Sequence, residues 1–199
     1  MSTENYVEDK PKKIKEIRAE AEQKSCAVQR ALYFVDEFAA KPMCGKCYPC
    51  ALGTGEAQIR LDRLSRRKDA VDEKDLELLE RIGDKMVQGS LCKRGKDTGE
   101  FILEIISNAR DEFEKHISHS CPNKECKNLI QYEIDPELCD MCGECKQGCR
   151  FNAILGEKKH PFFSGYQPFQ IRQKRCTRCG ECVDLCPTGA IVLNPQSNK

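Results

Sequence analysis

Two cysteine-rich stretches decide the C-terminal part of the chain: Cys139-Asp-Met-Cys142-Gly-Glu-Cys145-Lys-Gln-Gly-Cys149 and Cys176-Thr-Arg-Cys179-Gly-Glu-Cys182-Val-Asp-Leu-Cys186. Their cysteines share one spacing, with two, two and three residues between them. Each stretch is followed by the same pair, Ala153-Ile154 or Ala190-Ile191. Three thiolates on one tight, glycine-containing loop suit three irons of a cubane. The stretches are therefore an internal repeat that predicts metal binding.

The repeat resembles the two-cluster bacterial ferredoxins over about residues 132 to 195. In that family the fourth cysteine of each run binds the other cluster. The resemblance implies one 4Fe-4S cluster on Cys139, Cys142, Cys145 and Cys186, and a second on Cys176, Cys179, Cys182 and Cys149. The first run departs from the pattern, because Arg150 stands where Pro187 follows the second run. The long connection between the runs predicts a surface hairpin around residues 158–165. A four-cysteine zinc site is the alternative for each run.

A further set of cysteines lies earlier in the chain, in Cys44-Gly-Lys-Cys47-Tyr-Pro-Cys50 and in Gly89-Ser-Leu-Cys92. Residues 27–118 resemble the iron–sulfur domain of the NADH-binding flavoprotein subunit of respiratory complex I and its relatives in soluble hydrogenases and formate dehydrogenases. That resemblance implies a third 4Fe-4S cluster, held by Cys44, Cys47, Cys50 and Cys92 on a small helical bundle. A four-cysteine zinc site is again the alternative.

Two cysteines lie between these regions, in Cys121-Pro-Asn-Lys-Glu-Cys126. The segment resembles the Cys-Pro-x-x-x-Cys linker in the flavoprotein subunits of multimeric iron hydrogenases. One interpretation is a zinc site on Cys121 and Cys126, and the other is two free thiols. The candidates for the two remaining ligands are His116, His119, Cys139 and Cys149; use of the last two would take ligands away from cluster binding. Cys26 lies in a helical pattern with no partner spacing, so we expect it to be buried as a small hydrophobe.

Hydrophobic spacing predicts an α+β fold, with four helices before the ferredoxin-like part. Apolar residues recur every three to four positions in four segments: Val28, Leu32, Val35 and Ala39, ending before Pro42; Ala57, Leu61 and Leu64, after Thr54; Leu76, Leu79, Ile82 and Met86, after Asp72; and Ile102, Ile105, Ile106, Ala109 and Phe113. Asp97 and Glu100 have the spacing of a capping box, which predicts the start of the last helix. We expect a tail (1–12), a four-helix bundle (13–118), a linker (119–131) and a two-cluster domain (132–199).

The composition of the chain argues against several classes of protein. The chain has 199 residues and 15 cysteines, and its segment at residues 1–12 lacks the apolar core of a secretory signal. An odd number of cysteines cannot all pair internally, which favours reduced thiols, metal ligation and a cytoplasmic protein. The net charge of +1 argues against nucleic-acid binding. No run of apolar residues is long enough for a membrane span.

We therefore expect an iron–sulfur electron-transfer subunit with no catalytic residues of its own. The sequence contains no G-x-G-x-x-G, so we expect neither FMN nor NAD to bind to this chain. By resemblance, its partners are a flavin- or NAD(P)-binding subunit and another redox subunit or soluble ferredoxin. The implied setting is a hydrogenase or formate dehydrogenase complex, electron-bifurcating in some relatives, in an anaerobic organism. The alternative function is a zinc-stabilised scaffold without a redox role.

Overall fold

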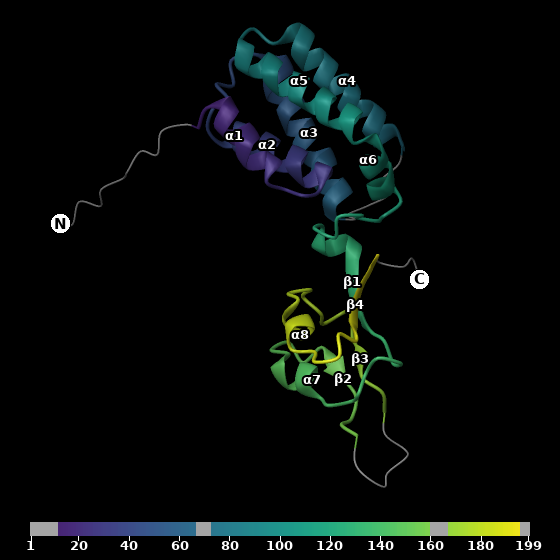
Figure 1. The fold of residues 1–199 in the computed structure, drawn as a ribbon. Coiled ribbons are helices and arrows are strands. Elements are labelled where there is room, and N and C mark those ends of the chain that lie inside the picture. The colour runs from purple at the N-terminus through teal and green to yellow at the C-terminus, as the bar shows by residue number, and fades with distance from the viewer. Residues whose placement is uncertain (1–11, 67–72, 160–166, 196–199) are drawn as a thin grey trace, which may run out of the picture. The chain divides into compact units, whose positions relative to one another are not determined.

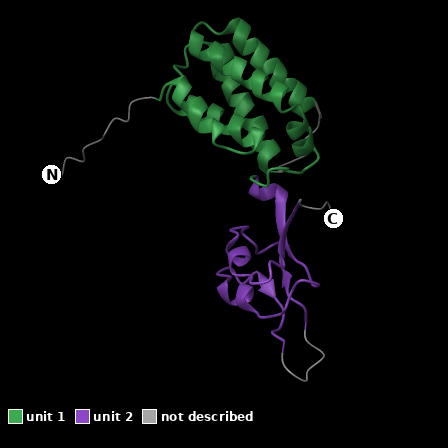
Figure 2. Ribbon diagram, viewed as in Figure 1, with its two compact units in different colours: residues 1–125 green, residues 126–199 purple. Residues whose placement is uncertain are grey.

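A computed structural model describes residues 12–66, 73–159 and 167–195 (Figure 1). The chain forms two compact units, residues 1–125 and residues 126–199 (Figure 2). Most of the expected N-terminal tail and of the expected hairpin around residues 158–165 lies outside the described residues. No helix in the described ranges combines the length and the apolar character that crossing a membrane requires.

The first unit is helical (Figure 1). Its described part contains α1 (Ile14–Glu22), α2 (Ala27–Ala40), α3 (Tyr48–Arg66), α4 (Glu73–Gly89), α5 (Lys93–Asn108) and α6 (Arg110–Ile117). The expected count of four helices was therefore too low. Helix α1 was not foreseen, and the last expected helix is divided at Ala109, where φ is −135° and ψ is 35°. This break gives α6 its own buried face, with Phe113 and His116 fully enclosed.

Two expected helix starts were wrong, whereas α2 ends before Pro42 as predicted. Helix α5 begins directly after Cys92, so Asp97 lies inside the helix. There Asp97 accepts a hydrogen bond of 2.7 Å from Lys93, at the i,i+4 spacing of a helix interior. Helix α3 begins at Tyr48 and not after Thr54. Both helices therefore start within one residue of a motif cysteine.

The core of the first unit is formed by the faces that the helices turn toward one another. Its largest fully buried apolar side chains are Ile17, Phe34, Phe38, Leu61, Leu64, Leu79, Met86, Ile102, Ile106 and Phe113. Glycines allow close helix contacts: a Cβ on Gly99 would lie 2.6 Å from the carbonyl oxygen of Gly83, and one on Gly89 would lie 2.9 Å from Pro49. The contact at Gly89 brings the end of α4 against the start of α3.

The second unit has short elements around a small core. They are η1 (Lys127–Leu129), β1 (Ile130–Ile134), α7 (Glu144–Gly148), β2 (Ile154–Leu155), β3 (Gln170–Ile171), α8 (Glu181–Asp184) and β4 (Ile191–Pro195). Strand β1 pairs antiparallel with β4, with Ile134 opposite Ile191, and β2 pairs antiparallel with β3. Cys145, Ile154, Phe169 and Ile191 form the buried core. The expected α+β class agrees with this mixture of helices and short strands.

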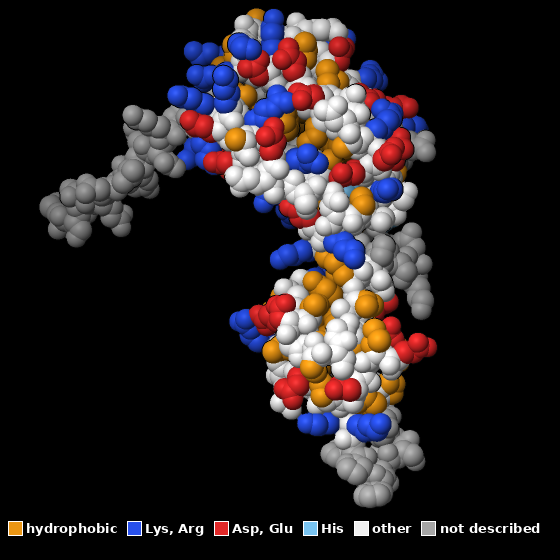
Figure 3. Space-filling view, in the orientation of Figure 1, with side chains coloured by type: hydrophobic (Ala, Val, Ile, Leu, Met, Phe, Trp, Pro, Cys, Tyr) orange, Lys and Arg blue, Asp and Glu red, His pale blue; other side chains and the backbone are white. Residues whose placement is uncertain are grey.

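Basic and acidic side chains both occur on each unit over the face that Figure 3 shows. This mixing agrees with a chain that has 33 basic and 32 acidic residues.

Candidate metal centres

Four cysteines meet at one end of the helical unit. Cys44 and Cys47 lie on the loop before α3, Cys50 lies in the first turn of α3, and Cys92 immediately precedes α5. Cys47 and Cys50 are buried, whereas Cys44 is exposed. The pKa of Cys50 is raised to about 11, first by burial and then by the charges of the other three thiolates. The structure therefore brings the whole N-terminal set together at a site that reaches the surface.

Glycine at position 95 keeps this site compact. A Cβ on Gly95 would lie 2.7 Å from the hydroxyl oxygen of Ser90 and 3.2 Å from the Cβ of Cys50. Helix α5 can therefore approach α3 closely just after Cys92. The packing between helices, and not a local loop alone, places the distant fourth cysteine beside the first three.

In the second unit, the sequence repeat is also a repeat of backbone conformation. Equivalent residues take left-handed conformations in both copies: Met141 and Arg178 have φ of 58°, Gly143 and Gly180 have φ of 84° and 89°, and Asn152 and Gly189 have φ of 49° and 65°. Left-handed residues let the chain turn sharply between the cysteines of a run and again just after its last cysteine. The geometry of each loop is thus kept although the side chains differ.

The fourth cysteine of each run receives the same hydrogen bond. The backbone N–H of Ala153 donates to Cys149 Sγ at 3.4 Å, and that of Ala190 donates to Cys186 Sγ at 3.3 Å. Burial opposes ionisation of Cys186, but hydrogen bonds from Thr188 and from backbone N–H groups outweigh it and lower the pKa of that thiol. Both copies therefore present a thiolate-stabilising amide at equivalent positions.

The fourth cysteines lie with the opposite run. The pKa of Cys145 is raised to about 11 by burial and by the charges of three thiolates, those of Cys139, Cys142 and Cys186. Cys149 instead lines a narrow apolar pocket together with Cys176, Cys179 and Cys182. The pKa of Cys182 is likewise raised to about 11, first by burial and then by Cys176 and Cys179. Each of the two sets therefore combines three cysteines of one run with the fourth cysteine of the other run.

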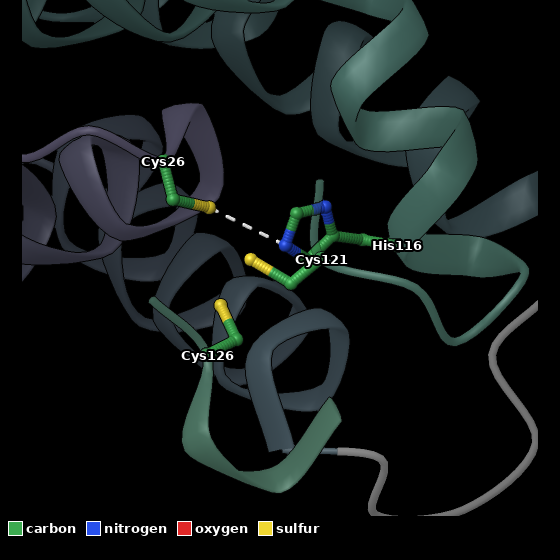
Figure 4. A group of neighbouring side chains, drawn as sticks. All are labelled: Cys26, His116, Cys121 and Cys126. Atoms are coloured by element: carbon green, nitrogen blue, oxygen red, sulfur yellow. Dashed lines mark hydrogen bonds between the residues drawn. The ribbon is translucent and has the colours of Figure 1, made fainter. Parts of the chain in front are cut away.

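A fourth group consists of Cys26, His116, Cys121 and Cys126 (Figure 4). All four are buried, and their candidate ligand atoms lie within 4.8 Å of one another. Cys26 Sγ is 3.3 Å from His116 Nε2. Cys126 is placed by its chain neighbour Glu125, whose carboxylate accepts hydrogen bonds from Ser25 and from the backbone N–H of Cys26.

This group changes two expectations about ligands. Of the candidates proposed to accompany Cys121 and Cys126, His116 belongs to the group, and His119, Cys139 and Cys149 do not. Cys26 is buried as expected, but the expectation that it lacks a partner was wrong. It precedes α2 and is not part of the helix interior. A separation of 90 residues from His116 leaves no local spacing by which this role could have been recognised.

The size of the group fits a single ion. Zn–S bonds of about 2.3 Å in a tetrahedron place the ligand atoms roughly 4 Å apart. Apart from this group, no three His, Cys, Asp or Glu side chains of the described residues gather so closely, and those residues include every cysteine. In a cubane each thiolate binds a different iron, so its cysteines stand farther apart. The spacing of the Cys26 group therefore fits a single zinc ion better than a cluster.

His116 is oriented toward the three thiols. Its Nδ1 lies 2.6 Å from the carbonyl oxygen of Glu112, which can only accept, so Nδ1 donates the proton. This bond is typical of metal-binding histidines and turns Nε2 toward the ligand position. Burial lowers the pKa of His116, but hydrogen bonds with Cys121 and Cys26 outweigh burial and raise it to about 10. The thiols thus stabilise a positive charge at the position of the His116 imidazole.

Residues 121–126, which we call the strap, are held against the start of α2 by hydrogen bonds of carboxylate and amide side chains. Glu125 Oε2 accepts from the backbone N–H of Cys26 at 2.7 Å. Asn123 Nδ2 donates to the carbonyl oxygen of Ser25 at 2.8 Å and to Glu112 Oε2 at 3.0 Å. Glu112 Oε2 also accepts from the backbone N–H of Ala27 at 2.9 Å. No sequence pattern marks these residues, which hold Cys26 and the strap in register.

We expect Glu125→Gln to weaken zinc binding by about 10- to 100-fold, the usual cost of losing a residue that orients a metal ligand. The substitution removes the charge that accepts from Cys26 and Ser25 but preserves the size of the side chain. Competition with a chromophoric chelator measures the affinity. Glu100→Gln, at an exposed position of α5, is the matched control. Equal affinities for the two variants would show that the strap contacts do not support the site.

Comparison with known protein families agrees with both parts of the fold. Residues 30–116 match the NADH-ubiquinone oxidoreductase-F iron-sulfur binding region. Residues 138–191 match the 4Fe-4S dicluster domain. The first match contains all four N-terminal cysteines, and the second contains both runs of the repeat. The resemblances drawn from the N-terminal cysteine set and from the ferredoxin-like repeat are confirmed.

Two curated relatives match parts of the chain. The NADP-reducing hydrogenase subunit HndC of Solidesulfovibrio fructosivorans is 34% identical over 137 residues, which cover 68% of this chain and 27% of the relative. The F subunit of the NADH-quinone oxidoreductase of Streptomyces coelicolor is 32% identical over 105 residues, which cover 52% of this chain and 23% of the relative. The chain thus spans about a quarter of the length of these relatives.

Proposed function

Because the chain joins an iron–sulfur binding region of the NADH-ubiquinone oxidoreductase-F type to a 4Fe-4S dicluster domain, we propose that it relays single electrons through three 4Fe-4S clusters. In this proposal residues 13–118 hold one cluster, residues 132–199 hold two, and the linker at residues 119–131 supplies ligands to a zinc ion. The observation that carries the proposal is the placement of the two fourth cysteines: Cys149 lines a pocket with Cys176, Cys179 and Cys182, and the charge of Cys186 acts on Cys145 of the other run.

The clusters supply reversible one-electron chemistry, and the protein side chains control it. The cysteines Cys44, Cys47, Cys50 and Cys92 hold the first cluster; Cys139, Cys142, Cys145 and Cys186 hold the second; Cys176, Cys179, Cys182 and Cys149 hold the third. The amides of Ala153 and Ala190 donate to thiolates of the two clusters in the second unit. Such hydrogen bonds stabilise added negative charge and so favour the reduced cluster.

The zinc ion has a structural role in this proposal. Three thiolates and one imidazole complete a tetrahedral set, which leaves no open position for a substrate. The site joins the start of α2, the end of α6 and the strap, three segments that are far apart in the sequence. Because Cys26 and His116 complete the set, the zinc site needs no cysteine from the clusters.

The relatives guide the proposal about partners. HndC is a subunit of an NADP-reducing hydrogenase, and the second relative is a subunit of an NADH-quinone oxidoreductase. We propose that this chain exchanges electrons with a flavin- or NAD(P)-binding subunit and with another redox subunit or a soluble ferredoxin. A cytoplasmic hydrogenase or formate dehydrogenase complex, including an electron-bifurcating one, provides such partners.

Metal analysis of the anaerobically purified full chain tests the proposal. We expect about twelve irons, about twelve acid-labile sulfides and about one zinc per chain. Reduction with dithionite should give EPR signals of interacting clusters, because crossed ligation places the two clusters of the second unit close together. A colourless protein that contains mainly zinc would overturn the redox role and favour the zinc-stabilised scaffold.

A further inference from the structure

Arg150 distinguishes the two copies of the repeat. It follows Cys149, whereas Pro187 follows Cys186. The Arg150 guanidinium forms a two-pronged ion pair with Glu181: Nε–H donates to Oε2 at 3.2 Å, and Nη2–H donates to Oε1. Glu181 is the first residue of α8 and precedes Cys182. The pair therefore connects the neighbours of two cysteines, Cys149 and Cys182, that line the same pocket.

The other copy cannot form the same pair. Glu144 is the equivalent of Glu181, because each follows the left-handed glycine of its run and precedes the third cysteine. The position equivalent to Arg150 is Pro187, and a proline side chain has neither a charge nor a donor. The carboxylates thus occur in both copies, but the arginine occurs in only one. The two centres therefore differ in local charge.

The positive charge of Arg150 interacts with one thiolate of this centre, that of Cys179. Its pKa is raised mainly by the hydrogen bond to Glu181 and further by the charges of Glu181 and the Cys179 thiolate. A one-electron reduction adds one negative charge to a cluster, so a nearby cation favours the reduced state and a nearby carboxylate opposes it. Exposure to solvent weakens both effects without changing their signs.

We propose that Arg150 is a positioning residue that holds Cys149 at its cluster and, balanced by Glu181, sets the reduction potential of that cluster apart from the potential of its neighbour. The inference rests on the proposed function, because it requires a cluster on Cys149, Cys176, Cys179 and Cys182. Because the two clusters then differ in reduction potential, an electron shared between them resides more often on the cluster with the higher potential.

Redox titration of the full chain, followed by EPR, tests the inference with Arg150→Gln, Glu181→Gln and the double variant. Arg150→Gln leaves the carboxylate uncompensated and should lower the potential of this cluster. Glu181→Gln should raise it, and the double variant should lie between the two. Shifts of the reduction potential in opposite directions would show that charge is responsible. If the ion pair only held the loop in place, both single variants would lose the cluster.

Glu144→Gln is the matched control in the other copy. It should raise the potential of the cluster on Cys139, Cys142, Cys145 and Cys186 and leave the one beside Arg150 unchanged. Unmoved potentials, or shifts in the same direction for Arg150→Gln and Glu181→Gln, would overturn the inference. A wild-type chain with no reducible cluster would instead overturn the proposed function.

A further variant keeps the inference testable if Arg150→Gln loses its cluster. Arg150→Lys keeps the positive charge but cannot form the two-pronged pair. It should retain iron and a potential closer to that of the wild type than the potential of Arg150→Gln. Loss of the cluster in Arg150→Lys as well would exclude charge as the basis of the effect.

Discussion

Replacing Cys26 with alanine is expected to abolish stoichiometric zinc binding and to remove the stabilisation that zinc gives to the helical unit. Structural zinc contributes about 10–16 kcal/mol to the folding of small zinc-binding peptides, so loss of one of four ligands has a large effect. Cys26 is fully buried, and its sulfur lies beside the ring of His116. Zinc analysis and the unfolding midpoint, measured with and without a chelator, give the two readouts.

The comparison between zinc-loaded and chelated protein separates a ligand from a packing residue. If Cys26 only fills space, Cys26→Ala should lower the midpoint equally in both conditions. If it binds zinc, the chelator should destabilise the wild type strongly and the variant very little. Val28→Ala is the control, because Val28 is also fully buried in α2. That variant should keep its zinc and should still respond to the chelator.

Paired substitutions in the two runs are expected to reveal crossed ligation. Cys139→Ala combined with Cys186→Ala removes two ligands from one cluster, so the other four-iron cluster of the second unit should remain intact. Cys139→Ala combined with Cys149→Ala removes one ligand from each cluster, so no intact four-iron cluster should remain there. Iron analysis and EPR of the dithionite-reduced protein measure the outcome, with a loss of about four irons expected for the first pair.

Uncrossed runs would give the reverse result. Each run would then hold its own cluster, so Cys139→Ala with Cys149→Ala would spare the other run. Cys139→Ala with Cys186→Ala would damage both. The N-terminal cluster is the internal control, because neither pair includes a residue of the helical unit. Its signal should persist in every variant.

The sequence predicts the cysteine loops well because their ligands are close together along the chain. The spacing of each run identifies three residues of one loop, and the structure shows the same left-handed turns in both copies. Helix α2 was also predictable, because its apolar spacing ends before Pro42. The start of α5 was not, because the capping-box spacing of Asp97 and Glu100 competes with a start directly after Cys92. Local sequence signals therefore do not predict where a helix begins when two possible start positions compete and tertiary packing selects one.

The Cys26 group shows a different limit. His116 could be proposed because it lies five residues before Cys121. Cys26 could not, because its proximity depends on how α2 packs against α6. The contacts of Glu112, Asn123 and Glu125 were missed for the same reason, since acidic and amide residues are common on protein surfaces. Only the folded chain shows that these side chains meet the backbone at the start of α2.

The pairing of β1 with β4, together with the crossed ligation that we propose, implies that the second unit matures late during synthesis. The first run emerges from the ribosome early, but the fourth ligand proposed for its cluster, Cys186, belongs to the second run and emerges with the residues that precede β4. Strand β1 must likewise wait for its partner. The helical unit has no such delay, because its four cysteines are complete at Cys92 and the zinc group is complete at Cys126. N-terminal domains generally fold first during translation. Metal loading should therefore proceed in order along the nascent chain, with the paired clusters inserted last and together.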